Sequence, residues 1–132
     1  MTTGPTTIAM MAAIEALEGD QTFIGLMVAT YRRRRDLLLN KLKGLPLLKN
    51  NVPQGAFYVF PDCSAYFGKS CNNITIRSAE DLCVYLLEEA HVGTVPGEAF
   101  GEPNCFRISY ATSDDKLTEG MDRIKKALDK LV

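Results

Sequence analysis

The chain has 132 residues, of which 46% are hydrophobic and 23% are charged, enough for one domain with a buried core. Its 15 Lys and Arg against 16 Asp and Glu leave a formal charge of -1, which argues against a nucleic-acid-binding or membrane-surface protein. No apolar run approaches the roughly 20 residues that span a bilayer, and the N-terminus lacks the pattern of a secretory signal. A small ligand or a protein partner is therefore expected, with no nucleic acid and no membrane.

Two helices are expected at the N-terminus. The segment Thr3-Gly4-Pro5-Thr6 resembles a helix entrance, and apolar residues then recur near helical spacing. Asp20 is expected to cap a second, long helix over residues 21–43 that ends at Gly44. Its apolar stripe comprises Ile24, Met27, Val28, Tyr31, Leu38 and Leu42.

Four consecutive arginines, residues 32–35, lie on this second helix. They invite a nucleic-acid or nuclear-localisation interpretation, but successive side chains on a helix turn by about 100° and so do not form one stripe. The alternative is a solvated basic belt paired with nearby carboxylates such as Asp36.

Short strands and two further helices follow. Strands are expected over residues 56–60, over 93–95 and around Arg107, with a polar loop at 68–73. Ser78 with Asp81 resembles a capping box for a helix whose apolar stripe comprises Leu82, Tyr85, Leu86 and Ala90. The last helix is expected to start at Ser113 or Asp114, and its apolar face comprises Leu117, Met121, Ile124, Leu128 and Leu131. The order of elements predicts an α+β domain with a small sheet covered by helices.

The strand around Arg107 alternates between two faces. Phe106, Ile108 and Tyr110 share one face, which is expected to be core. Arg107 and Ser109 share the other face, which suits either open water or a polar cleft that an anion enters. Alternation alone does not choose between these two environments.

The residues show no self-contained catalytic constellation. Cys63, Cys71, Cys83 and Cys105 lack metal-site spacing and are expected to be free thiols, which favours a reducing, cytoplasmic compartment. His91, the single histidine, is interpreted as a structural helix-end residue. Two loops, residues 53–55 and 96–101, are shaped by proline and glycine and lead into strands.

Three ordered motifs, VPQGAFYVF, VGTVPGEAFG and FRISYATS, resemble the C-terminal small domain of class I and II pyridoxal-phosphate aminotransferases, especially bacterial-type aspartate aminotransferases. The segments TTGPTTIAMMAAIEAL and YRRRRDLLL are similar to the part that leads out of the family's large domain. The resemblance implies a mostly antiparallel small sheet covered by helices over residues 1–132. Residues 1–43 would be the long helical connection from a missing large domain.

The resemblance also implies a function and a site. Arg107 matches the arginine that binds the substrate α-carboxylate, and Phe57 matches an aromatic residue near the substrate, although core packing is an equal alternative for it. The family's SxSK segment with the Schiff-base lysine is missing from these residues, so no catalytic, cofactor-binding or metal-binding residue is expected here.

A parent protein is therefore expected to transfer an amino group between an amino acid, with aspartate favoured, and a 2-oxo acid. It would use pyridoxal 5'-phosphate and act as a homodimer, whereas this chain alone would be inactive and bind no cofactor. The alternatives are a related pyridoxal lyase, or a stand-alone α+β module that binds a carboxylate ligand.

Overall fold

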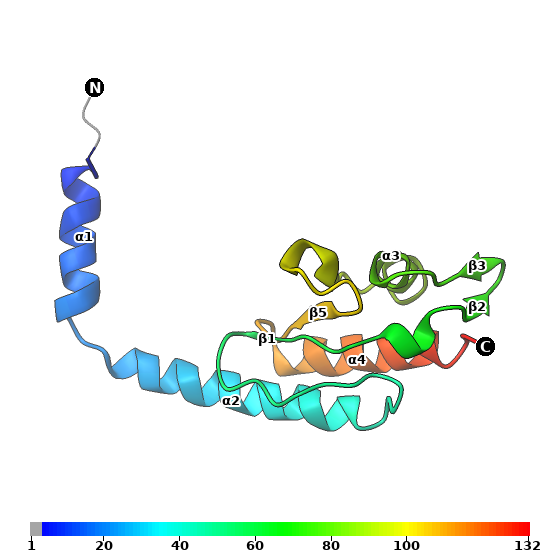
Figure 1. Cartoon of the computed structure of the whole chain (residues 1–132). Coiled ribbons are helices and arrows are strands. Elements are labelled where there is room, and N and C mark those ends of the chain that lie inside the picture. The colour runs from blue at the N-terminus through cyan, green and yellow to red at the C-terminus, as the bar shows by residue number, and fades with distance from the viewer. Residues whose placement is uncertain (1–3) are drawn as a thin grey trace. The chain divides into compact units, whose positions relative to one another are not determined.

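The computed structural model describes residues 4–132 and divides the chain into two compact units, Met1–Thr30 and Tyr31–Val132 (Figure 1). Four α-helices are present in the described part: α1 (Thr7–Glu18), α2 (Thr22–Leu42), α3 (Ala79–Ala90) and α4 (Asp114–Leu128). The strands are short: β1 (Tyr58–Val59), β2 (Ser70–Cys71), β3 (Ile74–Thr75), β4 (Val95–Pro96) and β5 (Phe106–Ser109). Two 3-10 turns, η1 (Ser64–Tyr66) and η2 (Gly97–Phe100), complete the α+β fold that the sequence predicts.

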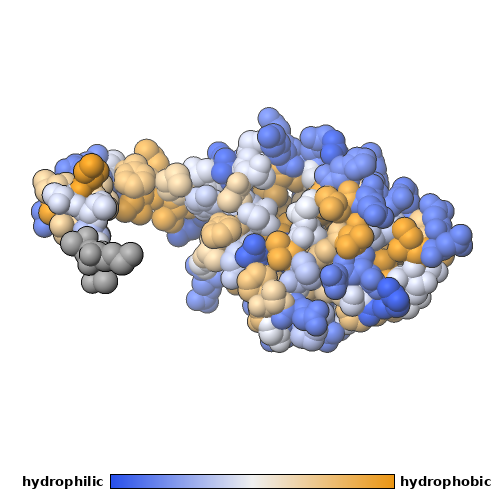
Figure 2. All heavy atoms as spheres, turned by 90° about the horizontal axis from the view of Figure 1, so that it is seen from above, coloured by the Kyte–Doolittle hydropathy of each residue, from blue (hydrophilic) through white to orange (hydrophobic). Residues whose placement is uncertain are grey.

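The N-terminal unit contains α1 and the first part of α2. Thr6 caps α1 by accepting a hydrogen bond from the Ala9 N–H, and Thr3 of the predicted entrance lies outside the described residues. Asp20 accepts a hydrogen bond of 2.9 Å from the Thr22 N–H, which confirms the predicted cap at the start of α2. No residue of α1 is buried, and Figure 2 shows many hydrophobic side chains on this unit.

The second unit holds the hydrophobic core. Leu38 and Leu42 of α2 are buried, whereas Ile24, Met27 and Val28 of the predicted stripe are exposed. The predicted buried stripes of α3 and α4 are confirmed for Leu82, Tyr85, Leu86, Ala90, Leu117, Met121, Ile124 and Leu128. Leu131 is buried as well, but it lies beyond the end of α4. Within the described residues, no helix is both long and apolar enough to cross a membrane.

A three-stranded antiparallel sheet has the order β1-β5-β4. Its register places Tyr58 opposite Ser109 and Val95 opposite Arg107. The predicted strand 56–60 pairs only at its centre, because Ala56 has a positive φ of 64° and leaves the extended conformation. The predicted strand 93–95 is shifted to β4, which runs one residue further to Pro96.

The loop predicted at 68–73 is wrong in part, because β2 and β3 form a hairpin within and after it. The turn residues Asn72 and Asn73 have φ values of 48° and 67°. Two consecutive residues with positive φ are the backbone of a tight two-residue hairpin turn, and asparagine tolerates this conformation better than most residues.

The helix ends of α3 differ in detail from the capping-box prediction. Ser78 accepts a hydrogen bond from the Asp81 N–H at 3.1 Å, as predicted. The Asp81 carboxylate binds the backbone N–H and the guanidinium of Arg77 instead of the Ser78 N–H. At the other end, His91 is the C-cap with a left-handed φ of 54°, a structural role as predicted.

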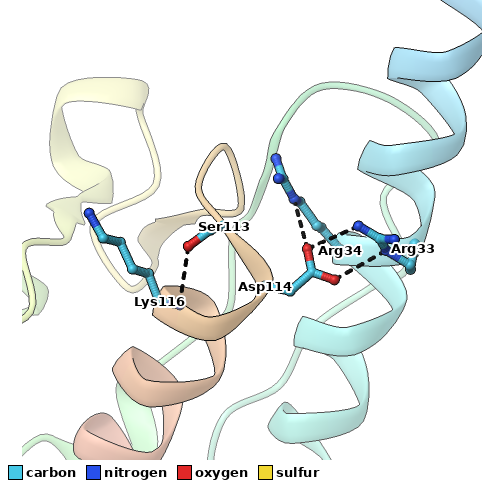
Figure 3. Close-up of polar contacts among 5 residues, drawn as sticks. All are labelled: Arg33, Arg34, Ser113, Asp114 and Lys116. Atoms are coloured by element: carbon cyan, nitrogen blue, oxygen red, sulfur yellow. Dashed lines mark hydrogen bonds and ion pairs between the residues drawn. The ribbon is translucent and has the colours of Figure 1, made fainter.

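Arginines of α2 connect that helix to the start of α4 (Figure 3). The Nε atoms of Arg33 and Arg34 each lie 3.1 Å from a carboxylate oxygen of Asp114. Arg35 pairs with Asp36, as the basic-belt interpretation expects. Asp114, the main partner, lies 80 positions away along the chain, so local sequence did not reveal it.

Candidate functional site

Arg107 lies on β5, the central strand of the three-stranded sheet. Phe106, Ile108 and Tyr110 are buried, as the predicted alternation requires, and Ser109 is exposed. Arg107 is half-buried, so its surroundings are not simply open water. The strand therefore presents a cation on the face that points away from the core.

Aromatic rings surround the Arg107 guanidinium. Its carbon Cζ lies 5.5 Å from the centroid of the Tyr58 ring and 5.0 Å from that of Phe100, both within the range of cation–π attraction. The β1–β5 register explains the first contact, because Tyr58 faces Ser109 and so lies diagonally across from Arg107 on the same face. The second contact comes from a loop.

The glycines of η2 bring Phe100 to this place. Gly97 is buried, its N–H donates a 2.7 Å hydrogen bond to the Cys105 carbonyl, and its own carbonyl accepts one from Glu102. A Cβ at Gly97 would lie 2.5 Å from the Cys105 carbonyl oxygen, so only glycine fits without a backbone shift. Gly101 ends the turn with a φ of 82°, which favours glycine as well.

Arg107 has no acidic partner among residues 4–132. The ion pairs and side-chain hydrogen bonds of the described residues all involve other groups. A guanidinium with free N–H donors, held at one side of a sheet, is suited to bidentate binding of a carboxylate.

Phe57, the other residue predicted at the site, is not one of the two rings over the Arg107 guanidinium. Its ring packs edge-on against Tyr58, with centroids 5.7 Å apart, and 47% of its surface is exposed. Its carbonyl accepts a 2.8 Å hydrogen bond from the Tyr110 N–H, which ties the 53–57 loop to the strand of Arg107. The structure thus connects Phe57 to Arg107 through Tyr58.

Neither Tyr58 nor Phe100 was predicted from the sequence as a site residue. Tyr58 belongs to the predicted strand 56–60, but the sequence does not show which residues this strand pairs with. Its position beside Arg107 follows only from the β1–β5 register. Phe100 could not be predicted from the periodicity of helices or strands, because it lies at the end of the 3-10 turn η2.

The described residues around Arg107 do not form a complete site for pyridoxal phosphate. The cluster offers one guanidinium and aromatic rings, which fit a carboxylate. The sequence lacks the SxSK segment that carries the Schiff-base lysine in the family. Lys41, one of the lysines present, is paired with Asp122 on α4, with its Nζ 2.7 Å from the carboxylate. Within residues 4–132, no group of three metal-ligating side chains is present.

The cysteines are free thiols, as predicted, and none takes part in the cluster of rings. Burial raises the pKa of the Cys63 thiol to about 12. Burial likewise raises the pKa of Cys83 and Cys105. Raised values make these thiols poor nucleophiles at neutral pH, which fits a structural role.

Comparison with known proteins matches residues 1–124 to the family described as aminotransferase class I and II. The aspartate aminotransferase of Rhizobium meliloti strain 1021 is 44% identical over 131 residues, which cover 98% of this chain and 32% of that protein. A probable aspartate/prephenate aminotransferase of Rickettsia conorii is 44% identical over 129 residues, covering 97% of this chain and 32% of that protein.

Solved structures agree with these relatives. A crystal structure of the aspartate aminotransferase from Rhizobium meliloti superposes with a TM-score of 0.92 at 44% identity, and the match covers 99% of this chain and 33% of that one. A Thermus thermophilus aspartate aminotransferase mutant gives a TM-score of 0.81 at 38% identity, covering 95% and 32%. The chain spans about a third of the length of the relatives that it matches.

Proposed function

Since this chain belongs to the class I and II aminotransferase family, we propose that residues 1–132 are the small, substrate-binding domain of an aspartate-type aminotransferase. Residues 1–43 are then the helical connection to a large domain, which the chain itself does not contain. The names of the relatives support an amino acid and a 2-oxo acid as substrates, with aspartate as the favoured amino acid. A homodimer is the expected assembly of the whole enzyme.

The half-buried guanidinium without an acidic partner is the observation that carries this proposal. Arg107 binds the α-carboxylate of the substrate through two parallel N–H···O bonds. Such a pair fixes both the position and the tilt of the amino acid, which a lysine ammonium would hold less well. Phe57 directly precedes β1 and is half exposed, which supports a role in shielding the bound substrate from water.

Pyridoxal 5'-phosphate, when bound, supplies the electron sink that amino-group transfer requires. The lysine, the acidic partner and the phosphate-binding groups for this cofactor belong to parts of the enzyme outside residues 1–132. The contribution of this chain is orientation, through Arg107, and exclusion of water. Binding energy at Arg107 also helps the small domain to close over the substrate.

A chimera tests the role of Arg107. Residues 1–132 replace the matching third of the Rhizobium meliloti aspartate aminotransferase, and Arg107→Ala is introduced in the chimera. A charge-assisted bidentate contact is worth about 1.5–3 kcal/mol, so kcat/KM for aspartate is expected to fall about tenfold to a hundredfold. The visible absorbance of the bound cofactor should stay unchanged.

Arg123→Ala is the matched control, because Arg123 is an exposed arginine paired with Glu119 on α4. Its kinetics should equal those of the unmodified chimera. A chimera that binds the cofactor but has no activity even with Arg107 present would contradict the proposal. An Arg107→Ala chimera whose kcat/KM for aspartate equals that of the unmodified chimera would contradict it too.

The isolated 132-residue chain should show no transamination when pyridoxal phosphate is added, because it lacks the lysine motif. Measurable amino-group transfer by the purified chain would overturn this part of the proposal. A stand-alone carboxylate-binding module is disfavoured, since relatives 40–44% identical over nearly the whole chain are aminotransferases.

A further inference from the structure

Arg107 has a flexible side chain and lies on the face of the sheet that points away from the core. A free arginine there would sample several rotamers and lose that freedom each time a carboxylate binds. In the structure two rings limit this freedom: Tyr58 from β1 and Phe100 from the end of η2. We propose that Tyr58 and Phe100, here called the aromatic clamp, are positioning residues that hold the Arg107 guanidinium ready for the substrate carboxylate.

The chemistry of the clamp explains why rings are used instead of carboxylates. An aspartate or glutamate would hold the guanidinium through its N–H groups and would compete with the substrate for the same donors. The face of an aromatic ring attracts the cation through its quadrupole and offers no carboxylate oxygen that would compete for the N–H groups. The N–H donors of Arg107 therefore remain available, since none of the ion pairs among residues 4–132 involves this residue.

Both clamp rings are themselves braced by a further ring. Phe60 packs edge-on against Phe100, with centroids 6.0 Å apart and an interplanar angle of 89°. Phe57 packs edge-on against Tyr58 at 5.7 Å and 87°. Edge-to-face pairs are a favourable arrangement of aromatic rings, so each brace limits the tilt of its clamp ring.

The loop adds a second constraint on Phe100. Gly97 and Gly101 fix both ends of η2, the first by its close approach to Cys105 and the second by its positive φ. Phe100 is 52% exposed, so burial in the core does not fix the position of its ring. Contact with the guanidinium gives this exposed ring a role.

The clamp rests on the proposed function, and the same chimera tests it. Phe100→Leu keeps an apolar side chain but removes the ring, and KM for aspartate is expected to rise about fivefold, within the range of cation–π energies. Phe100→Tyr and Tyr58→Phe each keep an aromatic ring, so the KM of these variants should equal that of the unmodified chimera. Leu87 is an exposed apolar residue on α3, so Leu87→Ala is the matched control and should leave KM for aspartate unchanged.

A double-mutant cycle separates positioning from general stability. In an Arg107→Ala background, Phe100→Leu should have no further effect on kcat/KM, because the group that it positions is gone. An equal effect in both backgrounds would overturn the clamp while leaving the proposed function intact. No effect of Arg107→Ala itself would overturn the proposed function instead.

A second readout needs no activity. In the 132-residue chain, ring currents from Tyr58 and Phe100 should shift the NMR signals of the Arg107 Nε–H and Cδ protons. Phe100→Leu should move these signals toward those of an exposed arginine such as Arg123, whereas Phe100→Tyr should keep them. Arg107 signals that stay unchanged in Phe100→Leu would contradict the clamp.

Discussion

Gly97→Ala should damage the fold and the site together. Gly97 begins η2, next to β4, and packs against the backbone that leads into β5. An added Cβ would lie 2.5 Å from the Cys105 carbonyl oxygen and closer still to the Glu102 carbonyl oxygen. Both neighbours are backbone atoms, so no side-chain rotation relieves the overlap.

The expected magnitude follows from these contacts. Overpacking in a closed site costs about 1–3 kcal/mol. The backbone shift also strains the Gly97 N–H bond to Cys105 and the Glu102 N–H bond to Gly97, 2.7 and 3.1 Å long, each worth about 1 kcal/mol. We therefore expect the free energy of unfolding to fall by about 3 kcal/mol.

Urea denaturation of the 132-residue chain, followed by far-ultraviolet circular dichroism, measures this change. Two glycines serve as controls. Gly101→Ala has free space but a φ of 82°, and should cost about 1 kcal/mol. Gly93→Ala has neither a neighbour within 4 Å nor a positive φ, and should stay within about 0.5 kcal/mol of the parent. A Gly97→Ala protein as stable as Gly93→Ala would refute the packing argument.

Three further predictions concern the second unit. The two arginines of α2 lower the pKa of Asp114 from its ordinary value of 3.8, so the stability from this carboxylate is present above that value and lost as pH falls below it. Asp114→Asn should therefore be less stable than the parent at pH 7, and the difference in stability should shrink below pH 3.8. A difference in urea midpoint between Asp114→Asn and the parent that is the same at pH 7 and in acid would contradict this. Cys63 should react with iodoacetamide at pH 8 about a thousandfold more slowly than in urea, because its raised pKa leaves little thiolate, as peptide mass spectrometry can measure. The Tyr85 hydroxyl donates a buried 2.8 Å hydrogen bond to the Ala127 carbonyl, so Tyr85→Phe should lower the free energy of unfolding by about 1 kcal/mol in the same urea assay; an unchanged midpoint would show that the bond contributes nothing.

Helix positions were predictable because their signals are local. Apolar spacing identified α3 and α4, and Ser113 marked the start of α4, where its hydroxyl accepts a hydrogen bond from the Lys116 N–H (Figure 3). The short strands were placed less accurately, since a two-residue ladder depends on a distant partner. The Asn72-Asn73 turn was missed because the polar residues around it were interpreted as a loop.

The sequence by itself determined that Arg107 points away from the core, because alternation along a strand is a local property of the backbone. Ordered motifs along the chain determined the family. Only the tertiary structure decided what surrounds the cation. Tyr58, Phe100 and Arg107 come from three separate segments, and their meeting depends on the strand register and on a turn that Gly97 and Gly101 make possible. Contacts between such distant segments depend on how the whole chain packs, so no local pattern of residues predicts them.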